Sequence, residues 1–259
     1  MGSYIDASGR RADFDAMSFV TTYESTYFLN QPRTVRGIRQ SSRYVEEEIE
    51  KVLTRGFSSC VDVVRVMAWK AGKIRHRCSE DSRSFVYCSD WNGIEEAAMK
   101  KGRVPSASLR EGSALDIPSF AVYVYQEVRT WARELQKAGG QGILEKMEKV
   151  CPAGMGTTQM LSLLYFISNG DYPIIDRFAG TALNAIKRGV CSEDDAPGVS
   201  LWESLPEKGS RGFKTVFQDR ILPYRESLDD LFGNEWKASR RIDRSLWVYG
   251  HRFPGTSCR

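Results

Sequence analysis

The chain has 259 residues, of which 41% are hydrophobic and 27% charged, and this composition excludes a wholly disordered or collagen-like protein. Lysine and arginine total 37 against 33 aspartate and glutamate residues, and the net charge of +4 is too small to indicate a nucleic-acid partner by itself. The longest apolar runs, such as Met160 to Ile167, are far shorter than the roughly 20 residues that cross a bilayer. The first residues lack the apolar segment of a secretory signal, so we expect a soluble, cytoplasmic protein without a membrane partner.

The cysteines and histidines do not form a metal-binding pattern. None of the six cysteines has the C-x-x-C spacing of zinc sites and redox motifs, and the two histidines, His76 and His251, are far apart in the sequence. We therefore expect reduced thiols, no metal ion and no cofactor.

Residues 1–40 are polar and mixed, and we expect an N-terminal arm that is partly mobile. A helical pattern begins at Ser42, where apolar residues recur every three or four positions, and Gly56 ends it. A second helix follows and ends near Gly72.

The next part of the chain is less regular. Residues 73–91 are polar, and Phe85–Tyr87 is too short to support a sheet. Asn92 followed by Glu95 is typical of a helix N-cap with its reciprocal partner, and it predicts a short helix that ends at Lys101. Glycines and prolines then predict a loop that extends to position 118. Because recognition residues usually lie on loops, we expect these two irregular segments to shape a binding pocket.

A long amphipathic helix is predicted from Ser119 to Lys137, and strand signals are sparse throughout. Two further helices are predicted at residues 143–150 and 157–168, joined by the turn Pro-Ala-Gly-Met-Gly. Without Cβ atoms, the glycines let the backbone approach another chain closely. Amides that point outward at the start of a helix bind phosphate through N–H groups and the helix dipole, although a plain helical corner uses the same glycines.

The block from Pro152 to Asp176 resembles the helix-hairpin-helix (HhH-GPD) superfamily of DNA glycosylases, which includes endonuclease III and the alkyladenine glycosylases. Hairpins of that family read approximately Leu-Pro-Gly-Val-Gly-x-Lys-Thr-Ala, and the counterpart here is Pro-Ala-Gly-Met-Gly-Thr-Thr-Gln-Met. In endonuclease III-like members an essential aspartate follows the lysine position by 18 residues, and the same spacing separates Thr158 from Asp176.

The sequence around Asp176, Tyr-Pro-Ile-Ile-Asp-Arg-Phe-Ala, resembles that of a poorly characterised bacterial branch of this family. That branch also has a Trp-Lys pair near the end of an early helix, as at Trp69-Lys70, and an Asp-Arg-x-Leu-Trp segment near the C-terminus, as at Asp243–Trp247. The resemblance spans roughly residues 42–250, and its most specific part is the block from the hairpin to the aspartate.

The resemblance implies an all-α protein of two helical lobes, with the active site in the cleft between them. Residues 41–170 would form the lobe that ends in the helix-hairpin-helix, and residues 171–259 the C-terminal lobe, which packs with the N-terminal segment. The implied activity is that of a monomeric DNA glycosylase. Such an enzyme flips a damaged or modified base out of the duplex and hydrolyses its N-glycosidic bond, leaving an abasic site. The base would be a lesion or a hypermodified base such as those in phage DNA.

Three departures from the family pattern matter. Ala153 replaces the proline before the first glycine, Thr158 replaces the lysine nucleophile of bifunctional members, and a four-cysteine iron–sulfur signature near the C-terminus is missing. We therefore expect a monofunctional enzyme.

Asp176 is the expected catalytic carboxylate, because an ionised aspartate stabilises an oxocarbenium-like sugar. It is equally suited to cap the helix that begins at Arg177, and the two roles are compatible. The residues expected to bind the DNA backbone are Gly154, Met155, Gly156, Thr157 and Thr158. The residues expected to line the base pocket are Trp69, Lys70, Asp90, Trp91 and Tyr172.

Three alternatives remain open. Lys70 could supply an amine nucleophile and make the enzyme a bifunctional glycosylase/lyase. The hairpin could bind phosphates in a non-catalytic DNA-binding protein, or the chain could be a helical adaptor. Basic clusters, such as the one at Lys237–Arg244, could neutralise phosphates or could simply form solvated helix faces.

Overall fold

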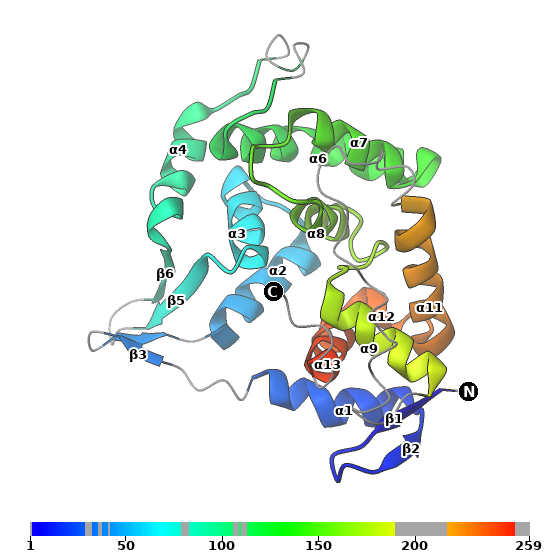
Figure 1. The fold of residues 1–259 in the computed structure, drawn as a ribbon. Coiled ribbons are helices and arrows are strands. Elements are labelled where there is room, and N and C mark those ends of the chain that lie inside the picture. The colour runs from blue at the N-terminus through cyan, green and yellow to red at the C-terminus, as the bar shows by residue number, and fades with distance from the viewer. Residues whose placement is uncertain are drawn as a thin grey trace.

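A computed structural model shows a mostly helical protein (Figure 1). It describes residues 2–28, 33–35, 38–40, 42–78, 83–105, 109, 113–189 and 217–251. In these ranges no helix is long and apolar enough to span a bilayer. The predominantly helical fold class predicted from the sequence is confirmed.

In chain order the helices are α1 (Ala16–Tyr27), α2 (Ser42–Arg55), α3 (Cys60–Lys70), α4 (Ile94–Lys101), α6 (Ile117–Ala138), α7 (Gln141–Val150), α8 (Thr157–Ile167), α9 (Arg177–Arg188), α11 (Leu222–Phe232), α12 (Glu235–Ala238) and α13 (Arg241–Gly250). The helices predicted between residue 42 and α9 differ from the observed ones by only a few residues at their ends, whereas α1, α11, α12 and α13 were not predicted. Short helical turns also occur at Ser89–Trp91 and Phe217–Ile221.

Local capping explains where several helices begin and end. Asp116 precedes α6, and its side chain accepts a hydrogen bond of 2.7 Å from the Ser119 amide. The predicted cap of α4 at Asn92 is wrong, because Gly93 occupies the N-cap position with a left-handed φ of 77°. The Glu95 side chain instead pairs with Arg65 at 2.8 Å and holds α4 against α3.

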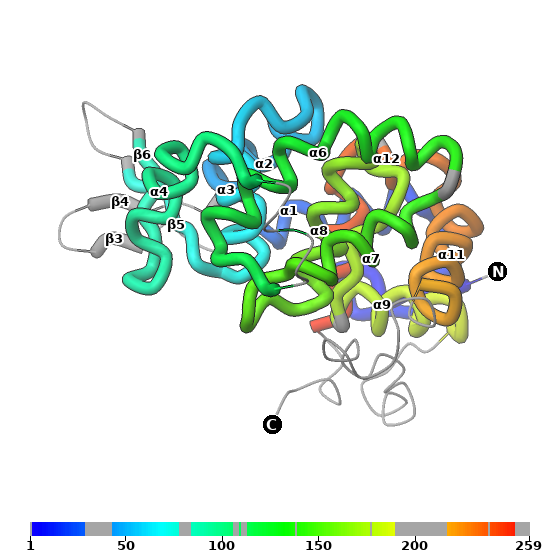
Figure 2. The backbone as a smooth tube through the Cα atoms, turned by 90° about the horizontal axis from the view of Figure 1, so that it is seen from above, coloured from blue at the N-terminus to red at the C-terminus, as the bar shows by residue number. Residues whose placement is uncertain are grey.

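Two small antiparallel sheets are the main difference from the sequence expectation. β1 (Ser3–Ile5) pairs with β2 (Arg11–Asp13), and a second sheet has the order β3 (Arg33–Val35), β4 (Ile38–Gln40), β5 (Ile74–Cys78) and β6 (Arg83–Tyr87). The expectation that residues 73–91 form an irregular loop is therefore wrong for β5 and β6. Pairing of His76 with Phe85 puts these side chains on one face of the sheet, where the histidine is buried. Figure 2 shows β5 and α4 at one end of the molecule and α11 at the other.

The N-terminal segment is not an arm in the described part of the chain. Residues 2–28 form β1, β2 and α1, and α1 packs along α13. Phe19 and Tyr23 of α1 are fully buried, and the Tyr23 ring lies 5.1 Å from the ring of Tyr249. Residues 2–28 therefore pack with the C-terminal helices.

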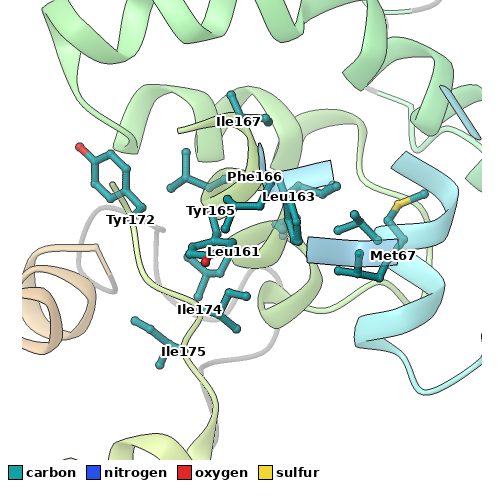
Figure 3. Close-up of a cluster of buried hydrophobic side chains, with 14 of the residues drawn as sticks. Met67, Leu161, Leu163, Tyr165, Phe166, Ile167, Tyr172, Ile174 and Ile175 are labelled. Carbon is teal, nitrogen blue, oxygen red and sulfur yellow. The ribbon is translucent and has the colours of Figure 1, made fainter. Parts of the chain in front are cut away.

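Helix α8 lies at the centre of the fold and contacts α3, α6 and α7. Almost all of its side chains are buried, as expected for a helix that is apolar on all sides. Figure 3 shows the cluster around it, in which side chains of α8 meet Met67 of α3 and Ile174 and Ile175 of the segment before α9. This extended segment fixes where α9 begins.

Backbone contact fixes the position of α9 on its other side. A Cβ atom built on Gly250 of α13 would lie 2.0 Å from the carbonyl oxygen of Phe178 in α9. Only a glycine allows two helices to approach this closely. Helices α9 and α13 therefore touch through their main chains.

Candidate functional site

A tight turn joins α7 and α8 at the glycines that the sequence singled out. Gly154 has a left-handed φ of 79°, and the Met155 amide donates to the Pro152 carbonyl at 3.2 Å. The Met155 side chain is buried and anchors the turn, whereas Gly154 is exposed. The Gly156 amide, which we expected to be available to phosphate, donates to the Gln159 side chain at 3.0 Å. A phosphate oxygen would have to compete with Gln159 for this amide.

Asp176 is the N-cap of α9. Its backbone is extended, and its Oδ1 accepts a hydrogen bond of 2.9 Å from the Ala179 amide. This confirms the capping interpretation. The cap fixes one carboxylate oxygen and leaves the other, Oδ2, directed away from the helix end, and the side chain keeps 19% of its surface exposed.

Lys70, the last residue of α3, is the ionic partner of Asp176. Its Nζ lies 3.5 Å from Asp176 Oδ2, and the lysine side chain is only 12% exposed. Each charge also suits its helix end, because a C-terminus favours a cation and an N-terminus favours an anion. The structure thus brings together two residues that the sequence assigned separately to the pocket and to catalysis.

A buried ion pair lies beside Trp69 and supports this site. Glu46 of α2 accepts hydrogen bonds from the Trp69 indole at 2.7 Å and from the Tyr27 hydroxyl at 2.9 Å, and it pairs with Arg240. The Arg240 guanidinium lies over the Trp69 ring, 4.1 Å from its centroid. Burial opposes ionisation of Glu46, but Arg240 and the two hydrogen-bond donors hold its pKa below its usual value. Trp69 is therefore a fixed wall of the site, held by Glu46 and Arg240.

The basic cluster at Lys237–Arg244 is half internal: Lys237 and Arg241 keep exposed surface, whereas Arg240 and Arg244 are buried. Arg240 is 2% exposed and Arg244 is 3% exposed. Arg244 pairs with Glu24 at 2.8 Å and with Glu50 at 3.2 Å, so it joins α13 to α1 and α2. These two arginines are already neutralised by carboxylates, so they neither form a solvated face nor remain available to DNA phosphates.

The other expected pocket residues have different surroundings. Asp90 is exposed and pairs with Lys73 at 2.9 Å. Trp91 is buried, with 8% of its surface exposed. The Tyr172 hydroxyl accepts a hydrogen bond of 2.8 Å from the Gly140 amide, so this buried ring braces the corner between α6 and α7. The structure therefore assigns Trp91 and Tyr172 packing contacts, whereas it places Trp69 and Lys70 beside each other at Asp176.

A separate cavity has a volume of about 640 Å³. Its walls include Phe57, just before α3, Arg129 of α6, and Phe166 at the end of α8. Lys70, Asp176 and the glycine turn are not among the described residues that line it. The cavity still borders the site, because the ring of Phe166 lies 6.3 Å from the ring of Trp69.

The sequence analysis did not name Glu46, and it named Arg240 and Asp243 only within the basic cluster and the resemblance to the bacterial branch, without a role at this site. Glu46 belongs to a run of acidic residues that is typical of a solvated helix face, yet it lies on the side of α2 that carries Ile49 and Leu53. This position of Glu46 in the sequence could have indicated a buried ion pair, because a charged residue in the apolar stripe of a helix needs a buried partner. The sequence did not indicate that Arg240 is this partner.

Comparison of the chain with family models, with curated proteins and with solved structures finds no match. Over the described ranges, no group of three or more histidine, cysteine, aspartate or glutamate side chains could hold a metal ion.

Proposed function

We propose that this protein is a DNA glycosylase that uses Asp176 to hydrolyse the N-glycosidic bond of a damaged or modified nucleotide. The observation that carries the proposal is the Lys70–Asp176 pair at a partly exposed helix start. The spacing from the glycine turn to Asp176, which resembles that of helix-hairpin-helix glycosylases, gives the pair its chemical meaning.

The carboxylate suits the charge that develops in this reaction. As the bond between C1′ and the base breaks, the base leaves with the bonding electrons and the sugar becomes positively charged. Asp176 carries its negative charge on an oxygen that the Ala179 amide does not occupy. A fixed charge of this kind stabilises the oxocarbenium-like state without reorganisation. Water then adds to C1′, and its proton passes to the carboxylate or to the departing base.

The turn between α7 and α8 would hold the DNA strand beside this site. Gly154 is exposed at the tip of the turn, and α8 begins immediately after it. Backbone amides and the positive end of the helix dipole bind phosphate irrespective of sequence. The turn would thereby set the register of the strand, while Asp176 acts on the extruded nucleotide.

The test is base release from a panel of duplex DNAs that carry different modified bases. Asp176→Asn removes the charge but keeps a side-chain oxygen that can cap α9. We expect base release to fall by about 100-fold or more, the scale found when one preorganised electrostatic contact is removed.

Asp15→Asn is the matched control, because Asp15 caps α1 in the same way and accepts from the Ser18 amide at 2.8 Å. Its activity should match that of the wild type. Equal base release by Asp176→Asn and wild type would overturn the assignment of Asp176. Salt-dependent DNA binding without base release on any substrate would indicate a non-catalytic DNA-binding protein.

One observation favours a second candidate, a glycosylase/lyase. The Lys70 Nζ is 3.5 Å from Asp176 and mostly sheltered from solvent, which is where an amine would have to lie to attack C1′. In that reaction Lys70 first gives a proton to Asp176 or to the departing base, and the C1′–base bond then breaks as a C1′–Nζ bond forms. The nitrogen lone pair next forms the C=N bond of a Schiff base as the C1′–O4′ bond breaks and O4′ takes a proton.

A further inference from the structure

Asp243, in the first turn of α13, is a partly buried carboxyl group that the chemistry above does not use. Its Oδ2 lies 3.2 Å from an Arg240 nitrogen. Although 21% of the side chain is exposed, its Oδ1 contacts no solvent and has no hydrogen-bond partner among the described residues. A buried carboxylate oxygen without a partner is costly, so this oxygen needs an explanation.

The hydroxyl group of Tyr165 in α8 is also buried and lacks a hydrogen-bond partner among the described residues. Tyr165 and Asp243 line one small cavity of about 20 Å³, together with Ile174 and Tyr224. This volume accommodates one water molecule, and the two unpartnered oxygens in an otherwise mostly apolar wall would give that water its hydrogen-bond partners.

A count of charges around Arg240 points to a missing proton. Arg240 contacts Glu46 and Asp243, and Lys70 pairs with Asp176. Asp243 also interacts electrostatically with both Asp176 and Lys70. The cluster therefore has two cations and three carboxyl groups, so it is neutral only if one carboxyl group keeps a proton.

The groups that face this cluster from neighbouring elements do not supply the missing positive charge. Arg244 is already paired with Glu24 and Glu50. Three tyrosine hydroxyl groups also face the cluster, those of Tyr27 of α1, Tyr165 of α8 and Tyr224 of α11. Burial raises the pKa of each above its ordinary value, so all three are neutral.

Asp243 is the carboxyl group best suited to hold the proton. Glu46 accepts three donors, which hold its pKa below the usual value, and each oxygen of Asp176 has a partner, the Ala179 amide or Lys70. Asp243 has a single cationic contact and an unpartnered oxygen. Burial raises its pKa, with Arg240 opposing the shift and Asp176 adding to it.

We propose that Asp243 is protonated in the folded protein near neutral pH and that its proton is hydrogen-bonded through one water molecule to Tyr165. Asp243 is then a positioning residue, because a neutral neighbour leaves Asp176 as the sole anionic partner of Lys70. The consequence for catalysis rests on the proposed function, whereas the proton itself does not.

The proton can be tested without any activity. Protein labelled with ¹³C at the aspartate carboxyl carbons is titrated by NMR, and infrared spectra are compared in H2O and D2O. We expect one aspartic acid that stays protonated at pH 7 and is lost in Asp243→Asn. In Asp176→Asn its pKa should fall, because the cluster then has two cations and only two carboxyl groups. Aspartates that are all ionised at pH 7, or a protonated one that disappears in Asp176→Asn alone, would overturn the proposal.

Tyr165→Phe gives a second, nearly isosteric variant in case Asp243→Asn does not fold. It should shift the infrared band of the protonated acid while retaining the band, because it removes one partner of the water molecule. An unshifted band would exclude the link to Tyr165. If base release is observed, its decline at high pH should be lost in Asp243→Asn, and identical pH profiles would contradict the positioning role.

Discussion

The ammonium group of Lys70 and the carboxylate of Asp176 meet at 3.5 Å between the end of α3 and the start of α9. One oxygen of Asp176 caps its own helix, and the other belongs to the ion pair. An ammonium in an ion pair has no lone pair with which to attack a sugar carbon. The arrangement therefore favours hydrolysis with Asp176 as the working charge.

The first prediction concerns this lysine. Incubation of the wild type with substrate DNA and borohydride should give no covalent protein–DNA adduct, because a monofunctional enzyme forms no Schiff base. The measurement is a shift in gel mobility, with a known bifunctional glycosylase as a positive control. An adduct that forms with wild type and vanishes in Lys70→Ala would instead establish the lyase reaction.

The second prediction concerns Glu46. Glu46→Gln leaves the buried Arg240 with Asp243 as its remaining carboxyl contact among the described residues, and we expect a loss of about 3 kcal/mol in the free energy of unfolding. Urea denaturation measures this loss. Glu48→Gln is the control on the same helix, because its pair with Lys51 is exposed and should contribute less than about 1 kcal/mol. Similar losses in the two variants would contradict the importance of the buried pair.

The third prediction is the pH dependence of the same residue. The folded protein holds the pKa of Glu46 below its usual value, so the stabilisation is present above the unfolded pKa of about 4.3 and is lost as the pH falls. The difference in unfolding free energy between wild type and Glu46→Gln should therefore shrink on acidification. A difference that stays constant from pH 7 to pH 3 would show that Glu46 is not held as an anion.

The fourth prediction compares two glycines. Gly154 has a left-handed φ, and an added Cβ would meet no atom within 4 Å, so Gly154→Ala should cost about 1–2 kcal/mol through backbone strain alone. Gly142, inside α7, also has open space, but its helical backbone should make Gly142→Ala stabilising by up to about 1 kcal/mol. Thermal unfolding of both variants measures the difference. Effects of the same sign would contradict the left-handed turn.

The helices between residue 42 and α9 were predictable because their signals are local, whereas α1, α11, α12 and α13 were not predicted. The apolar period that begins at Ser42 and the left-handed Gly56 that ends it belong to one short segment, and α2 follows that segment. The strands were missed for the opposite reason. β5 and β6 have only five residues each, and β5 also pairs with β4, far away in the sequence. A search for local patterns does not detect such a pairing.

The site was predictable only in part. Asp176 and Lys70 were each identified, because one follows a glycine turn at a characteristic spacing and the other ends a helix beside a tryptophan. Their contact depends on how α3 packs relative to α9, which the sequence does not reveal. The role of Arg240 was hidden for a similar reason, since its partner Glu46 lies in a distant helix.

The main-chain contact between Gly250 and Phe178 limits how this protein can change. In a core, a smaller side chain at one position can compensate for a larger one beside it. Glycine already has the smallest side chain, a single hydrogen atom, so no such exchange is possible at Gly250. Any larger residue there would force α9 away from α13, and the cap at the start of α9 would move with it. The separation between the acidic groups on these two helices is thus set by the thickness of the polypeptide backbone.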